Sequence, residues 1–162
     1  MNADPRVMEH FPSILSRDES DALVDRIGAR WESDGFGLWA VERIEDEVFL
    51  GFTGLAPPGF EASFTPCVEV GWRLAVDAWG HGFATEAARA ALRFGFEELD
   101  LEEILSWTIP DNAPSRRVME RIGMTHDPAD DFDHPRHLAN ERIRRHVLYR
   151  LSRKRWASST AP

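Results

Sequence analysis

Two glycines, Gly80 and Gly82, stand where an apolar stretch gives way to a helical pattern. The surrounding segment reads WRLAVDAWGHGFATE, so a predicted strand passes through a glycine-spaced turn directly into a predicted helix. Such a turn leaves backbone N–H groups unpaired at the positive end of a helix dipole. Because glycine has no side chain, an anion can approach that backbone closely. The segment therefore predicts a phosphate-binding site.

Two common phosphate-binding loops do not fit this turn. A Walker A loop requires Lys and then Ser or Thr after its last glycine, whereas Ala84, Thr85 and Glu86 stand here. A dinucleotide loop requires an acid at the end of the next strand, about 20 residues further on. Asp100 has that spacing but precedes the next apolar run. The sequence therefore disfavours a nucleotide-binding oxidoreductase.

The turn instead resembles the acetyl-CoA loop of the GNAT acetyltransferases, Gln/Arg-x-x-Gly-x-Gly/Ala, with Trp79 in place of Gln or Arg. Five segments, in order, resemble the GNAT branch that contains the ribosomal-protein N-acetyltransferases. They are Glu69–Leu74, Trp79–Ala87, Asn112–Met119, Ile122–Met124 and His146–Arg150. The resemblance implies an enzyme that transfers the acetyl group of acetyl-CoA to a primary amine, by direct attack in a ternary complex. The acceptor would be a protein N-terminus or a small-molecule amine.

The resemblance also assigns the cofactor contacts by position. Backbone groups of Trp72 to Leu74 would pair with the pantetheine arm, and an amide there, with that of Leu74 favoured, would face the thioester oxygen. The amides of residues 80–85 would hold the pyrophosphate. Asn112 would hydrogen-bond the cofactor arm, although a plain helix cap is the alternative. The predicted cofactor contacts are Trp72, Arg73, Leu74, Trp79, Gly80, His81, Gly82, Phe83, Ala84, Thr85, Asn112 and Ser115.

Acetyl transfer also needs a base for the amine and an acid for the leaving thiolate. Glu69 is the leading base, since it lies on the predicted strand opposite the apolar set, and water could relay the proton. Ser115 is the candidate acid, with an ordinary first-turn serine as its alternative. Three histidines are alternative bases because imidazole titrates near neutral pH: His134, His137 and His146. No ligand spacing supports a metal site, and Tyr149, the single Tyr, is expected in the core with its hydroxyl at the edge.

Hydrophobic periodicity predicts the elements that position these residues. Apolar residues at helical spacing indicate helices, and alternation indicates strands. The expected helices cover 18–33, 83–98 and about 114–122, and the expected strands cover 38–43, 48–55, 67–76, 104–109, 124–126 and 145–152, with a polar loop at 127–141. This order predicts a mixed α/β fold. The resemblance adds a mostly antiparallel central sheet, flanked by helices, whose central strands splay into a V.

The ends of the chain carry further expectations. Residues 1–156 are predicted to form one acetyltransferase domain, with fraying from Arg153 and a disordered tail at 157–162. Members of the resembled branch begin with a strand that would lie upstream of Met1, so either the start is truncated or that strand is dispensable here. A missing first strand would expose a sheet edge. We therefore expect a homodimer, unless the segment from Val7 to Ile14 covers that edge.

Composition narrows the class of protein. A net charge of −9 argues against nucleic acid as a partner. No run of 18 apolar residues is present and the N-terminus lacks an apolar segment, so no membrane partner and a cytoplasmic location are expected. The one cysteine, Cys67, cannot form an internal disulfide and is interpreted as a buried or strand-edge thiol rather than a nucleophile. A non-catalytic module that senses acetyl-CoA is the alternative function, since the same loop would serve it.

Overall fold

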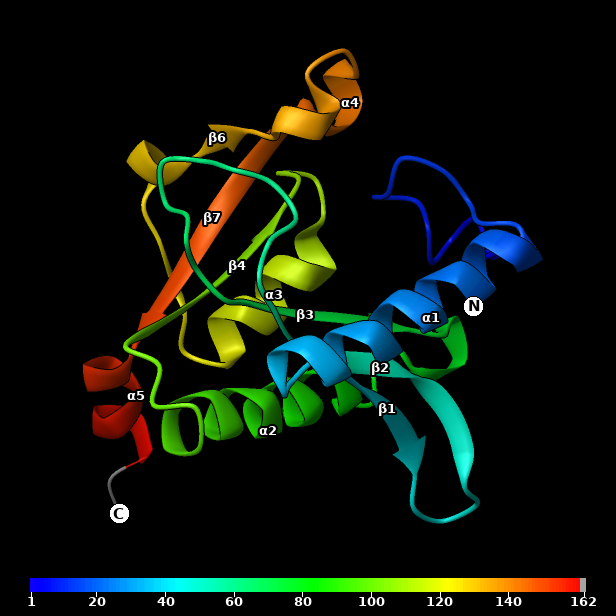
Figure 1. Ribbon diagram of the computed structural model, residues 1–162, viewed down its shortest axis with the longest axis horizontal. Helices are drawn as coiled ribbons and strands as arrows, with labels where there is room; N and C mark the ends of the chain where they lie inside the picture. Colours follow the sequence, from blue (N-terminus) through cyan, green and yellow to red (C-terminus); the bar gives the residue numbers. More distant parts are fainter. Residues whose placement is uncertain (161–162) are drawn as a thin grey trace.

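The computed structural model describes residues 1–160, in which a mixed sheet is flanked by helices (Figure 1). The strand order is β1-β2-β3-β4-β7-β5, and β6 pairs with β7. The strands are β1 (Leu38–Arg43), β2 (Val48–Ala56), β3 (Glu69–Leu74), β4 (Glu103–Thr108), β5 (Thr125–His126), β6 (Phe132–Asp133) and β7 (Arg145–Ser152). The helices are α1 (Arg17–Asp34), α2 (Phe83–Glu97), α3 (Ala113–Arg121), α4 (Glu141–Arg144) and α5 (Arg153–Thr160). This architecture confirms the predicted mixed, mostly antiparallel fold.

The centre of the sheet is its one parallel junction. Strands β3 and β4 are paired in register only at Glu69 and Leu105, where the Leu105 amide donates to the Val68 carbonyl at 2.9 Å. Every other neighbouring pair is antiparallel. Because β3 continues to Leu74 without further pairing to β4, the two strands splay apart, which confirms the predicted V.

Helix α2 packs against β2 and β3 through a narrow stripe of small residues. Gly95 shows how close this packing is, because a Cβ atom there would lie 2.6 Å from Ile104 Cδ1. Ala88, Ala91 and Leu92 are buried on the same stripe. The close approach holds the N-terminal end of α2 at the end of β3, where the glycine turn connects them.

Helix α1 begins at a capping box. Ser16 is the N-cap: its Oγ accepts from the Glu19 amide at 3.2 Å, and its own amide donates to Glu19 Oε2 at 2.8 Å. At the other end, Gly35 adopts a left-handed conformation with φ of 74° and ends the helix. Trp31, in the last turns of α1, donates to the Leu38 carbonyl at 3.0 Å and so reaches the start of β1.

Three segments differ from the expectation. The strand predicted at 67–76 is shorter, since β3 ends at Leu74 and a 3₁₀ turn occupies Val76–Ala78. The predicted polar loop at 127–141 contains β6 and two 3₁₀ turns, because Phe132 and Asp133 pair with the start of β7. The fraying expected from Arg153 is wrong as far as Thr160, where the chain forms α5. Stacking of Trp156 on Phe96, with centroids 5.6 Å apart, ties that helix to the core, and residues 161–162 lie outside the described residues.

The first 16 residues form turns that pack on the sheet rather than along its edge. Val7 and Met8 are buried, and Arg142 donates to the carbonyls of Glu9 and Phe11 at 2.5 and 2.8 Å. The segment from Val7 to Ile14 therefore lies toward α4 and β3. Within residues 1–160, β1 is paired with β2 alone. Trp31, rather than the segment from Val7 to Ile14, contacts the outer edge of β1.

Candidate active site

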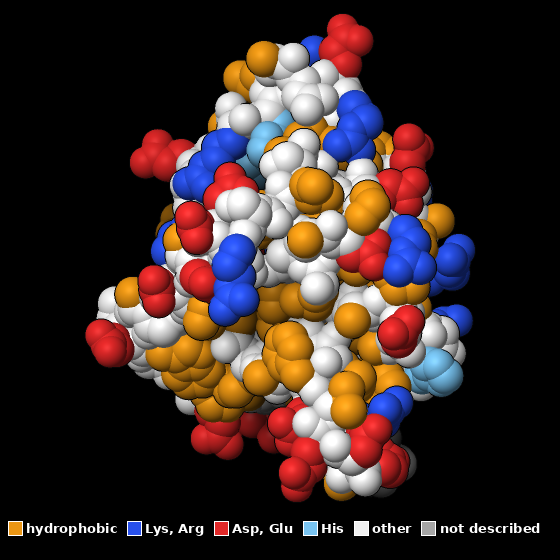
Figure 2. All heavy atoms as spheres, turned by 90° about the vertical axis from the view of Figure 1, so that its right-hand side faces the viewer, with side chains coloured by type: hydrophobic (Ala, Val, Ile, Leu, Met, Phe, Trp, Pro, Cys, Tyr) orange, Lys and Arg blue, Asp and Glu red, His pale blue; other side chains and the backbone are white. Residues whose placement is uncertain are grey.

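A cavity of about 740 Å³ brings most of the predicted site residues together. It extends from the glycine turn, along the splayed edge of β3, to the end of β4 and the start of α3. Among the predicted cofactor contacts only His81 is absent from its lining, and the exposed His81 ring packs beside Phe83 instead. Figure 2 views the side of the molecule at the right of Figure 1, where apolar side chains gather in the central and lower part, flanked by charges of both signs.

The glycine turn has the geometry that an anion requires. Gly80 and Gly82 have φ values of 79° and 89°, a region that side chains disfavour, and a Cβ atom at either would meet nothing within 4 Å. Gly82 is the N-cap of α2, so the first helical amides have no partner inside the helix. Thus the amides at the start of α2 are free to face a phosphate in open space.

Trp79 fixes this turn to the strand before it. Its indole N–H donates to the carbonyl of Leu74 at 3.0 Å, while the side chain remains 46% exposed. In the sequence, Trp79 is only a departure from the loop motif, and no local pattern predicts this contact. Here it closes the end of β3 and sets where the turn begins.

The open edge of β3 offers backbone groups to a ligand. Ala75 N–H donates to the Leu50 carbonyl on β2, so alternate residues direct their groups the other way, toward the splay. The Trp72 amide and carbonyl and the Leu74 amide belong to that second set. Ser106, buried on β4, donates to the Val70 carbonyl at 2.9 Å and marks the vertex of the V. An extended chain could therefore bind to β3 beyond this vertex as an added strand.

Asn112 is the N-cap of α3. Its Oδ1 accepts from the Ser115 amide at 3.2 Å, and its Nδ2 donates to Thr108 Oγ1 at 2.9 Å. The alternative reading as a helix cap is therefore correct, although one N–H and one lone pair remain for a ligand. Ser115 is half-buried and lines the cavity, as the predicted acid must.

Glu69 begins β3 at the vertex and also lines the cavity. Burial raises its pKa from 4.5 to about 8, against the opposing charge of Arg30 on α1. Among the described residues, none forms a hydrogen bond or an ion pair with its carboxylate. A carboxyl group in this state can exchange a proton near neutral pH.

The alternative bases form a cluster at another part of the cavity. The rings of His134 and His146 have centroids 5.0 Å apart, and that of His137 lies 4.4 Å from His134. Burial lowers the pKa of His134 from 6.5 to about 4 and also lowers that of His146. The backbone amide of Arg136 donates to His134 Nδ1. His134 is therefore a neutral imidazole at physiological pH, which makes it a weak base there.

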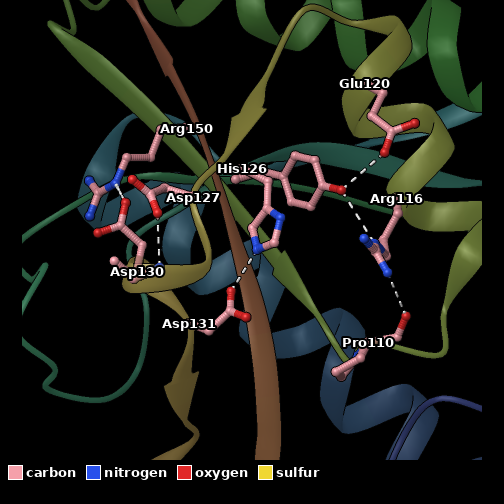
Figure 3. Close-up of polar contacts among 10 residues, drawn as sticks. Pro110, Arg116, Glu120, His126, Asp127, Asp130, Asp131 and Arg150 are labelled. Carbon is pink, nitrogen blue, oxygen red and sulfur yellow. Dashed lines mark hydrogen bonds and ion pairs between the residues drawn. The ribbon is translucent and has the colours of Figure 1, made fainter.

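Tyr149 lies away from the cavity. Arg116 Nε donates to its hydroxyl at 3.3 Å, and the hydroxyl donates to Glu120 Oε1 at 3.1 Å (Figure 3). The ring is buried and stacks on His126, which contacts Asp131 at 2.7 Å. The expectation of a core tyrosine holds, and this hydroxyl has no access to a ligand in the splay.

Two parts of the site escaped sequence reasoning. Arg73, chosen only for its backbone, has a side chain that lines the cavity, and the N-terminal segment forms a wall of the same cavity. The Arg73 side chain donates a hydrogen bond to Asn2, which is 71 residues away in the sequence, so no local pattern links the two residues. The polar position of Ser106 within an apolar strand was a signal that could have been used.

Three further features concern metal binding, membrane insertion and thiol reactivity. No group of three potential metal ligands with suitable geometry occurs among the described residues. Over the same part of the chain, no helix has the length and apolar character needed to cross a membrane. Burial raises the pKa of the half-buried Cys67 thiol to about 11, so it is not a ready nucleophile.

The chain belongs to the GNAT acetyltransferase family. The family model described as "Acetyltransferase (GNAT) domain" matches residues 1–125. The chain is 42% identical over 123 residues to the uncharacterized N-acetyltransferase YnaD of Bacillus subtilis, covering 75% of this chain and 68% of that protein. It is 38% identical over 171 residues to the FsC-acetyl coenzyme A-N(2)-transacetylase of Aspergillus fumigatus, covering all of this chain and 71% of that protein.

A solved structure agrees with these relatives. The GNAT-family acetyltransferase from Bacillus anthracis superimposes with a TM-score of 0.75 at 26% identity, covering 94% of this chain and 85% of that one. Together with the family match, this likeness identifies the chain as an enzyme of the N-acetyltransferase class.

Proposed function

We propose that this protein transfers the acetyl group of acetyl-CoA to a primary amine, by direct attack within a ternary complex. One observation carries the proposal: a single cavity joins the glycine turn, the open edge of β3 and Glu69. The relative from Aspergillus fumigatus supports the choice of donor, since its name specifies acetyl coenzyme A. Assignment to the ribosomal-protein branch stays a prediction.

In this proposal the backbone holds the donor. The amides from Gly80 to Thr85 bind the pyrophosphate, and the exposed groups of Trp72 and Leu74 pair with the pantetheine arm. The Leu74 amide then donates to the thioester oxygen, where negative charge develops during attack. The remaining N–H of Asn112 is available to the same arm. His81 contributes its backbone alone, since its exposed ring packs beside Phe83 and the residue is not part of the cavity lining.

The acceptor nitrogen attacks the thioester carbon, so a C–N bond forms and the C–S bond breaks. Glu69 takes one proton from the amine, through a water molecule. Ser115 gives one proton to the departing thiolate and recovers it from solvent. A base with a pKa of about 8 suits this exchange because it lies close to the operating pH.

The experiment is a continuous assay for free CoA with acetyl-CoA and a panel of amines and N-terminal peptides, with the products identified by mass spectrometry. Amine-dependent CoA release and an acetylated product are expected. Tight acetyl-CoA binding without release across the panel would favour the alternative, a module that senses acetyl-CoA.

A further inference from the structure

We propose that the Arg73 side chain binds a carboxylate of the acceptor, so that the preferred acceptor is an amine that also carries a carboxylate group. This inference rests on the proposed function and names the chemical class of its acceptor.

Arg73 lies on the same face of β3 as Glu69 and lines the same cavity. Four residues along a strand span about 13 Å, and the arginine side chain can extend over part of that distance. An acceptor whose amine lies near Glu69 can therefore place a second group at Arg73. Because α2 packs on the other face of the sheet, an acceptor in this cavity reaches β3 from the face that carries Glu69 and Arg73.

The Arg73 guanidinium lacks a counter-charge. Among residues 1–160 no carboxylate lies within 4.0 Å of it, and its one hydrogen bond runs from Nη1 to Asn2 Oδ1 at 3.0 Å. Its Nε is closed off from solvent without a partner. Burial lowers the pKa of Arg73 to about 10, so the group is still a cation at neutral pH. A buried cation without an anion is costly, and an anionic ligand would offset that cost.

Arg6 and Arg150, in contrast, have carboxylate partners. Arg6 contacts Asp4 at 2.7 Å, and Arg150 contacts Glu103 at 2.8 Å. Arg6 also lines the cavity, so position beside this cavity does not by itself leave an arginine unpaired.

The surroundings of Arg73 suit a carboxylate. The guanidinium carbon lies 4.1 Å from the centroid of the Phe11 ring and 5.3 Å from that of Phe52. Both rings therefore pack against the guanidinium and limit the directions from which a ligand can reach it. Nη2 has no hydrogen bond and is not closed off, which makes it the accessible donor. One guanidinium edge matches one carboxylate in shape and charge.

The test compares acids with their uncharged analogues. Unbranched ω-amino acids with two to six methylene groups, and the corresponding ω-amino amides, are titrated into the protein–CoA complex by calorimetry, and acetylation of each is measured. At one chain length the acid should bind about 10- to 100-fold more tightly than its amide, as expected for a hydrogen bond to a charged group. The same ratio should appear in kcat/KM.

Three variants make the result specific to Arg73. Arg73→Gln should bind CoA normally and lose the acid-over-amide preference, while Arg73→Lys should retain a weaker preference because it keeps the charge without the planar edge. Arg6→Gln removes a charge from the same cavity and should leave the preference unchanged. CoA affinity shows that each variant is folded.

The calorimetric arm needs no turnover, so it separates this inference from the proposed function. Acid preference without acetylation would support the Arg73 site and contradict the transferase. The Arg73 site would be overturned if the protein acetylated and bound acids and amides equally at every chain length. Undetectable binding of both would overturn it too. A preference that survives in Arg73→Gln would overturn it as well.

Discussion

Glu69 lines the cavity and has a raised pKa. Together these two features explain how its carboxylate could accept a proton from an amine. Glu69→Gln should lower kcat on the order of 10²-fold, since a positioned base contributes about that much. Affinity for acetyl-CoA should change little. The rise of kcat/KM toward a pKa near 8 in the wild-type protein should disappear in the variant. The measurement is kcat and kcat/KM against pH.

Glu42→Gln provides a matched control, because Glu42 is an exposed strand carboxylate on β1. It should behave as the wild-type protein does. An unchanged profile in Glu69→Gln would remove Glu69 from the mechanism and direct attention to His137, the histidine that is not fully buried.

The same pKa predicts how stability depends on pH. Glu69 has a pKa near 4.5 when unfolded and about 8 when folded. Between these values the unfolded chain releases the proton that the folded protein keeps, so the free energy of unfolding falls as pH rises. Glu69→Gln should flatten this slope between about pH 4.5 and 8. Urea unfolding at several pH values measures it, and equal slopes in both proteins would contradict the assignment.

At the level of elements, variants of Asn112 distinguish its role as the cap of α3 from a role in binding the cofactor. Asn112→Ala removes the cap of α3 and should cost about 1 kcal/mol of stability. Asn112→Asp keeps the accepting oxygen but loses the Nδ2 donor. If Asn112 also serves the cofactor, the Asp variant should weaken acetyl-CoA binding more than it lowers the melting temperature. Normal affinity in Asn112→Asp would assign this residue to the cap alone.

The local elements of the site could be predicted, since each depends on neighbours in sequence. The glycine turn, the start of α2 and the Gly35 stop follow from backbone freedom and helix ends. Two contacts could not be predicted from the sequence. The contact of Arg73 with Asn2 depends on tertiary packing, and that of Trp79 with Leu74 depends on a side chain that folds back onto the preceding strand. The tail was misjudged for the same reason, since Trp156 packs on Phe96.

At the scale of the whole molecule, the outer edge of β1 is the surface through which self-association is proposed. Trp31 contacts that edge at Leu38, while Ala40 and Glu42 are exposed. Self-association through the remaining edge is still a proposal, and closed twofold dimers are the commonest result of such a surface. Light scattering over a concentration series should then approach twice the chain mass of 18.4 kDa. A mass that stays at 18.4 kDa would contradict it.

The central claim is that acetyl-CoA binds with its pyrophosphate at the turn before α2, and a calorimetric titration of acetyl-CoA into two glycine variants tests it. Gly82→Val and Gly123→Val introduce the same backbone strain, because both positions have a φ of 89° and open space around a Cβ atom. Gly123 lies outside the cavity lining. Both variants should lose similar stability, but Gly82→Val alone should lose detectable acetyl-CoA binding, since its side chain blocks the approach to the amides. Wild-type affinity in folded Gly82→Val, or equal loss in both variants, would contradict the claim.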